Sequence, residues 1–88
     1  MDRDEAFRLA DVLARCANGY GDDREVGDAL RRLKAIGQYN LRTNVLEFRD
    51  AMKGRVPPGI SGAREQMFRN VDGIRGALGN FVYQDAPD

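Results

Sequence analysis

Residues 62–83, GAREQMFRNVDGIRGALGNFVY, decide the fold because they form the longest apolar helical pattern in the chain. The apolar side chains recur at steps of four, three, four and three, which is the spacing of one buried face of an α-helix. They are Met67, Val71, Ile74, Leu78 and Phe81, and Phe68, Val82 and Tyr83 widen the same face. We therefore predict a long last helix around which the earlier helices pack.

The same stretch carries glycines at positions 73, 76 and 79. A glycine inside a helix costs about 1 kcal/mol relative to alanine, so these positions need a physical reason. We expect the backbone of another helix to approach closely at this face. A kink or break near Asp72-Gly73 is the alternative.

The first helix is predicted to start at Asp2, with Glu5 three residues later in an acidic form of the capping box. Asn18-Gly19 ends it, because these residue types tolerate a left-handed helix cap. The second helix starts after Asp22 or Asp23 and ends at Gly37. The apolar faces of these two helices comprise Leu9, Val12, Leu13 and Cys16 in the first and Val26, Leu30, Leu33 and Ile36 in the second.

The third helix is predicted to begin at Asn40 as its cap and to close at Lys53-Gly54. Its apolar face comprises Leu41, Val45, Phe48 and Met52. Residues 55–59, RVPPG, form a semi-rigid connector, because each proline fixes its own backbone and restricts the residue before it. Ser61 or Gly62 then caps the last helix.

The chain of 88 residues is long enough for one domain only. We assign residues 1–83 to a single helical domain and residues 84–88 to a tail or the remnant of a linker. No alternation of apolar and polar residues is long enough to predict a strand. The predicted fold is all-α, a compact bundle of four to six short amphipathic helices.

The totals of charged residues and cysteines limit the class of protein. Fourteen basic residues balance fourteen acidic ones, so the net charge is zero, which argues against a surface that binds nucleic acid or membrane throughout. Cys16 is the only cysteine, which excludes an internal disulfide and fits a reducing compartment. With no signal-like or membrane-spanning apolar run, we expect a cytoplasmic protein without membrane partners.

The inventory of reactive side chains predicts that the chain is not an enzyme. It has no histidine, the commonest general base and metal ligand, and its single serine, Ser61, sits where a helix cap belongs. Cys16 lies on an apolar face and is interpreted as a small buried hydrophobic residue. Asp22, Asp23 and Glu25 do not have the spacing of a calcium loop, and capping explains them better. We therefore expect no catalytic residues, no cofactor and no metal.

A compact helical body with many charged side chains and no catalytic group is typical of a domain that binds another protein. The function predicted is a non-enzymatic protein–protein interaction module, with a homotypic or heterotypic partner and the capacity to self-associate. Its contacts are expected to come from exposed arginine, aspartate and glutamate side chains. The candidate protein-binding residues are Arg24, Arg31, Arg42, Arg49, Arg64, Asp22, Asp23, Glu47 and Asp50.

The alternative function is a small nucleic-acid-binding regulator of the kind that phages encode. Arg42, Arg49 and Lys53 lie seven and four residues apart on the third predicted helix and would form a basic ridge. Glu47 and Asp50 share that helix, and mixed charge on a solvated helix face is the simpler explanation.

In size, short amphipathic helices and charged faces, the chain resembles the death-fold superfamily, in particular the bacterial CARD-like and effector-associated adaptor domains. A helix broken at Asn18-Gly19, or near Gly73, would bring the number of helices close to the six of that fold. The terminal residues YQDAPD fit a module cut from a longer protein. The resemblance implies an adaptor that recruits partners through charged patches in defence signalling. It lies in the architecture, so it assigns no role to a particular residue.

Overall fold

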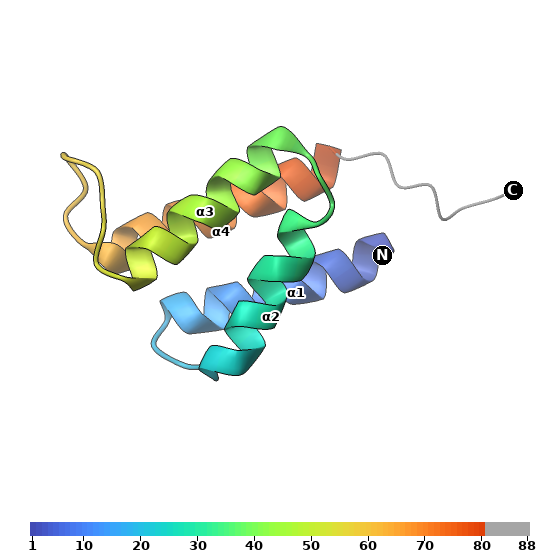
Figure 1. Ribbon diagram of the computed structural model, residues 1–88, viewed down its shortest axis with the longest axis horizontal. Helices are drawn as coiled ribbons and strands as arrows, with labels where there is room; N and C mark the ends of the chain where they lie inside the picture. Colours follow the sequence, from blue (N-terminus) through green and yellow to red (C-terminus); the bar gives the residue numbers. More distant parts are fainter. Residues whose placement is uncertain (81–88) are drawn as a thin grey trace, which may run out of the picture.

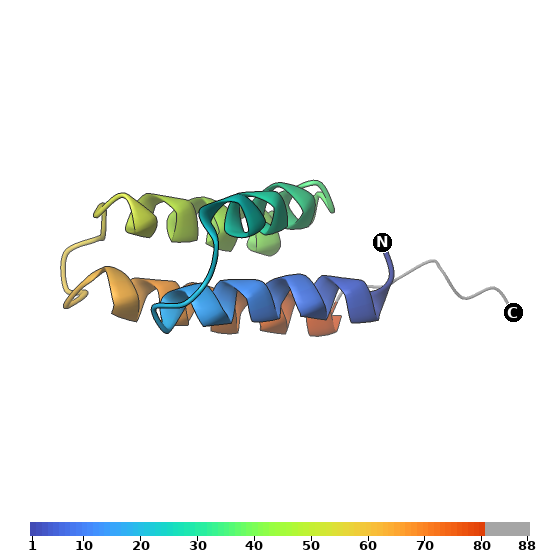
Figure 2. The same cartoon turned by 90° about the horizontal axis from the view of Figure 1, so that it is seen from below.

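The computed structural model describes residues 1–80 and folds them into four helices (Figure 1). They are α1 (Arg3–Ala17), α2 (Asp23–Lys34), α3 (Tyr39–Met52) and α4 (Ala63–Asn80). Helices α1 and α4 form one layer, and α2 and α3 form a second layer against it (Figure 2). The all-α prediction is confirmed for the described residues, with four helices among them. Phe81, Val82, Tyr83 and the predicted tail at 84–88 lie outside the described residues.

The predicted ends of α1 are confirmed, with one difference in the capping box. Asp2 accepts a hydrogen bond from the backbone N–H of Glu5 at 2.8 Å, and the helix closes at Asn18 and Gly19, where Gly19 has φ +91°. The Glu5 side chain does not turn back to the Asp2 backbone. It pairs with the Arg32 guanidinium of α2 and so links the two layers.

Of the two caps predicted for α2, Asp22 is the one used, because its side chain accepts from the backbone N–H of Arg24 at 2.9 Å. The helix ends at Lys34, and Gly37 follows with φ +85°, a backbone region that favours glycine. Basic side chains fill the last turn, where they complement the negative end of the helix dipole.

The cap predicted for α3 is wrong. Gln38, not Asn40, caps this helix, and its Oε1 accepts the backbone N–H of Leu41 at 2.7 Å. Asn40 is already helical, and its backbone carbonyl accepts from the side chain of Asn44 at 2.9 Å. The long glutamine side chain reaches the third N–H of the helix. Asn40, two residues later, already lies inside the helix and cannot cap it.

Helix α4 begins at Ala63, and Gly62 occupies the cap position because its carbonyl accepts the N–H of Gln66 at 3.2 Å. Ser61 precedes the cap and donates its hydroxyl and its backbone N–H to the Glu65 carboxylate. The helix runs without interruption through Gly73, so the predicted alternative of a break there is wrong.

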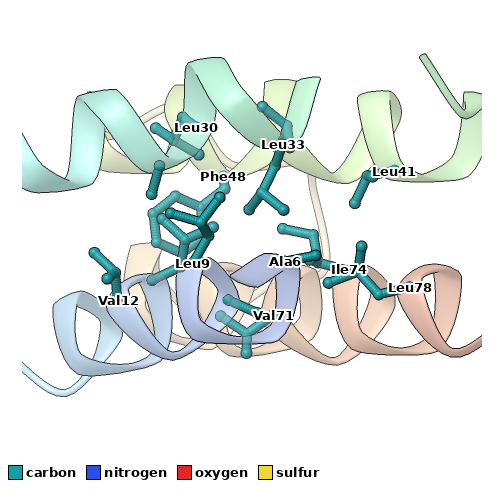
Figure 3. Close-up of a cluster of buried hydrophobic side chains, with 14 of the residues drawn as sticks. Ala6, Leu9, Val12, Leu30, Leu33, Leu41, Phe48, Val71, Ile74 and Leu78 are labelled. Atoms are coloured by element: carbon teal, nitrogen blue, oxygen red, sulfur yellow. The ribbon is translucent and has the colours of Figure 1, made fainter. Parts of the chain in front are cut away.

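The core lies between the two layers, and Figure 3 shows Phe48 of α3 among side chains from both of them. Most of the predicted apolar faces are buried, and each helix contributes. The largest fully buried apolar side chains are Phe48, Leu13, Leu33, Leu41, Ile74, Leu78, Val26, Val45 and Val71.

Two residues that the spacing assigned to buried faces are exposed instead. Met52 at the end of α3 is 39% exposed, and Phe68 of α4 is 37% exposed. The buried face of α4 is rotated toward Gln66 and Asn70, which are 5% and 1% exposed. Phe68 therefore points outward, where the Arg64 guanidinium lies 5.8 Å from its ring centre.

Candidate functional site

A groove of about 530 Å³ opens between α2 and α3. Its apolar floor is formed by Leu30 and Val45, whose other sides belong to the core, and by the half-exposed end of Met52. Gly27 also lines it, and a Cβ built on Gly27 would meet no atom within 4 Å. The absence of a side chain at this position therefore leaves the groove open.

The rim of this groove is basic. Arg31 and Lys34, three residues apart, lie on the α2 side, and Arg49 and Lys53, four apart, lie on the α3 side. Such spacings place each pair on one helix face. Among residues 1–80, Asp23 is the only acidic side chain that lines the groove. Four cations and one carboxylate thus surround an apolar floor, on a chain whose net charge is zero.

Three of the rim cations have no partner within residues 1–80. Arg31 pairs with Asp28 at 2.6 Å, whereas Lys34, Arg49 and Lys53 form no hydrogen bond or ion pair in that part of the chain. Elsewhere on the surface some arginine side chains have acidic partners, such as Arg75 with Asp11 at 2.9 Å, and others, such as Arg24 and Arg42, have none within residues 1–80. Three cations without an acidic partner in residues 1–80 therefore lie together around one apolar floor.

Of the nine predicted binding residues, the structure brings three together at the groove: Asp23, Arg31 and Arg49. The other residues at the groove were not in the predicted set, namely Gly27, Leu30, Lys34, Val45, Met52 and Lys53. The spacing of Arg31 with Lys34 and of Arg49 with Lys53 was a usable signal for the rim. The floor depends on which faces of α2 and α3 meet. Tertiary packing decides this, and the spacing of residues in the sequence does not indicate it.

The remaining predicted residues lie elsewhere. Arg24 is exposed on the first turn of α2, Asp22 caps that helix, and Arg42 is exposed near the start of α3. Arg64 lies over Phe68 on α4, and Asp50 lies 4.0 Å from Arg55 in the connector.

Glu47 belongs to a second polar arrangement, in which side-chain amides cross the interface between α3 and α4. The Asn70 amide donates to Glu47 at 3.0 Å and to Asn44 at 3.1 Å, and Gln66 donates to Asn70 at 2.9 Å. Among the described residues, no buried side-chain nitrogen or oxygen lacks a hydrogen-bond partner. This network is satisfied internally and has a structural role.

The backbone approach predicted at Gly73 is wrong, because the close neighbour there is a side chain. A Cβ on Gly73 would overlap the carboxamide of Asn44. At Gly76 and Gly79 a Cβ would meet nothing within 4 Å, so the close approach predicted there is wrong. Those two glycines lie on the exposed side of α4.

Cys16 is half-buried, and burial raises the pKa of its thiol, with the Asp23 carboxylate raising it further. The thiol is therefore held in its protonated, weakly nucleophilic form. Within residues 1–80, no three acidic or cysteine side chains gather in a way that would hold a metal ion. No helix in this part of the chain is both long and apolar enough to cross a membrane.

Comparisons of the chain with protein-family models, with curated proteins and with solved structures find no match. The chemistry of the groove is therefore the basis for the functional proposal.

Proposed function

We propose that this domain is a non-enzymatic protein-interaction module, and that it binds an acidic, amphipathic helical segment of a partner protein in the α2–α3 groove. One observation carries the proposal: an apolar floor lies between four cations, of which three have no partner within residues 1–80. An adaptor role of the kind that the death-fold resemblance implies is one form of it, because such adaptors also recruit partners through charged contacts.

The floor and the rim favour a helix that is apolar on one face and acidic at its edges. Docking of an amphipathic helix into a groove is a common mode of peptide recognition, with apolar anchors spaced three and four residues apart. The anchors would cover Met52 and the floor at Leu30 and Val45. Carboxylates beside those anchors would face Arg49 and Lys53 on one side and Lys34 on the other.

The two parts of the groove contribute differently to binding. Burial of apolar surface contributes about 25 cal/mol per Å², so the floor supplies most of the affinity. Exposed ion pairs contribute only about 0.2–1 kcal/mol each. The rim therefore acts mainly on partner choice and association rate, because it attracts acidic segments and repels basic ones.

A small nucleic-acid-binding regulator is the second candidate, and the unpaired cations favour it as well. Phosphate contacts would use Lys34, Arg49 and Lys53, and the binding would weaken steeply with salt because counterions are released. Phosphate groups bind cations and hydrogen-bond donors and gain nothing from contact with an apolar floor. The floor is the reason to prefer a protein partner.

The test uses a fluorescein-labelled helical peptide as long as α3, with leucine on one face and glutamate at its edges. Binding to the full chain is measured by fluorescence anisotropy. We expect Gly27→Leu, which puts a side chain into the groove, to weaken binding by about tenfold or more, equivalent to about 1.4 kcal/mol. The double variant Arg49→Glu, Lys53→Glu should weaken it at least as much.

Arg64→Glu is the matched control, because Arg64 is an exposed arginine on α4 outside the groove, and it should leave peptide binding unchanged. A peptide with lysine in place of glutamate should bind much more weakly. Equal binding of both peptides would contradict the proposal. Binding of duplex DNA that survives Gly27→Leu but not the Arg49 and Lys53 changes would favour the nucleic-acid candidate.

A further inference from the structure

We infer that the acidic helix bound in the α2–α3 groove carries one basic side chain, which pairs with Asp23 and fixes the direction in which the helix lies. The inference rests on the proposed function, because it adds a feature to the partner of the same groove. Within residues 1–80, Asp23 is the acidic member of a rim whose other charged side chains are cations.

The Asp23 carboxylate is available to a partner. Asp23 lies in the first turn of α2 and is exposed, and within residues 1–80 its side chain accepts no hydrogen bond and forms no ion pair. Its charge suits the positive end of the helix dipole, an effect that leaves the carboxylate free to bind. The neighbouring Asp22 caps α2 with its own carboxylate. Capping therefore explains Asp22 but not Asp23.

Asp23 occupies one corner of the groove. Helices α2 and α3 are joined by the turn at residues 35–38 and run in opposite directions (Figure 1). Asp23 therefore lies at the end of the groove away from that turn, and Lys53, which caps the end of α3, lies at the same end. Asp23 and Lys34 are the first and last residues of α2, about 16 Å apart along its axis. The α2 side of the rim is thus acidic at one end and basic at the other.

This asymmetry distinguishes the two directions of a bound helix. With its apolar face on the floor, a helix presents four corners to the rim, two at each end. Turning the helix end for end exchanges diagonally opposite corners. A basic side chain at either corner of one diagonal therefore meets Asp23 in one of the two directions. At either corner of the other diagonal it faces Lys34 or Lys53 in both directions.

The test uses four labelled isomers of the glutamate peptide, each with one lysine at a different corner. They have the same composition and net charge, so a general effect of charge is the same for all four. A peptide as long as α3 spans about 21 Å and reaches both ends of α2. By fluorescence anisotropy on the full chain, we expect the two isomers of one diagonal to bind about threefold or more tighter than the other two, because an exposed attraction replaces an exposed repulsion.

Substitution of Asp23 should move the two pairs of isomers in opposite directions. Asp23→Asn should weaken binding of the favoured isomers by about twofold or more, because their lysine loses its partner. It should strengthen binding of the other two, whose glutamates no longer face a carboxylate. Asp22→Asn is the matched control, because it removes the same charge at a residue outside the groove and asparagine also caps helices. It should leave the difference between the diagonals unchanged.

The direction of the bound helix is read from NMR spectra of the full chain with a nitroxide at the N-terminus of each favoured isomer. The isomer with its lysine near the N-terminus should broaden the amide signals at the start of α2. The isomer with its lysine near the C-terminus should broaden those of the turn at residues 35–38 instead. Broadening of the same signals by both would show that Asp23 does not set the direction.

Equal binding of the four isomers, or an Asp23→Asn change that shifts all four alike, would also overturn the inference. The peptide with glutamate at every corner separates this outcome from failure of the proposed function. If it binds and Gly27→Leu weakens that binding while the four isomers bind equally, the proposed function holds and only the role of Asp23 is wrong. If no peptide binds, both proposals fail.

Discussion

Among the described glycines, Gly73 is the one at which the interface between α3 and α4 leaves no room for a Cβ. The carboxamide of Asn44 occupies the space where a Cβ would lie, and it is fixed by bonds to the Asn40 carbonyl and to Asn70. A side chain at position 73 would have to displace it and break those bonds. The helix therefore keeps a residue of poor helical propensity because of one hydrogen-bonded neighbour.

We predict that Gly73→Ala lowers the free energy of unfolding by about 1–3 kcal/mol, the usual cost of overpacking a filled site. Gly76→Ala is the matched control on the same helix, because a Cβ there meets nothing within 4 Å. It should raise stability by up to about 1 kcal/mol through helix propensity alone. Urea unfolding of both variants tests this, and equal stability of the two would contradict the interpretation of Gly73.

The second prediction at the scale of a residue concerns the pKa of Glu65. Hydrogen bonds from the Ser61 hydroxyl and backbone lower the pKa of its carboxyl, and Arg69 lowers it to a smaller extent. The stabilisation from this ionised group is present above the ordinary glutamate pKa and is lost as pH falls through the lowered value. In an NMR titration, Ser61→Ala should raise the pKa of Glu65 more than Arg69→Ala does. The reverse order would show that the arginine is the main cause.

At the scale of the helix, several start and stop signals were read correctly where a short acidic side chain or a glycine forms the end, whereas α2 ends three residues before the predicted Gly37, with Ala35 as its cap. Asp2, Asp22 and Gly54 are examples. The error at α3 came from assigning the cap to Asn40, a typical capping residue, when Gln38 is the residue that bonds. Glutamine caps rarely, because its longer side chain loses more freedom when it is fixed, so residue preference gave no signal here.

This difference between the two residues can be measured. Gln38→Ala removes the side chain that satisfies the N–H of Leu41 and should destabilise the domain by about 1 kcal/mol. Asn40→Ala should have a much smaller effect, because the bond that Asn40 accepts is made by its backbone carbonyl. Thermal unfolding of the pair provides the comparison. A larger loss of stability in Asn40→Ala than in Gln38→Ala would show that Asn40 is the cap, as predicted from the sequence.

At the scale of the whole molecule, the sequence predicted the helical class, the approximate helix ranges and most of the core, because those depend on periodicity along the chain. The groove and the amide network depend on which helix faces meet. Gln66 and Asn70 lie four residues apart on the face that includes Val71 and Ile74, and an assignment based on apolar residues alone missed them. The same assignment placed Met52 in the core, whereas it is half-exposed at the groove.

The rim cations without partners have a consequence for how this surface can evolve. Lys34, Arg49 and Lys53 contribute no bond to the fold within residues 1–80, so selection on folding places little constraint on their identity. Mutations there can exchange one partner for another while the core and the amide network stay intact. A lineage that carries this domain can therefore diversify its recognition at these positions without first acquiring compensating changes elsewhere.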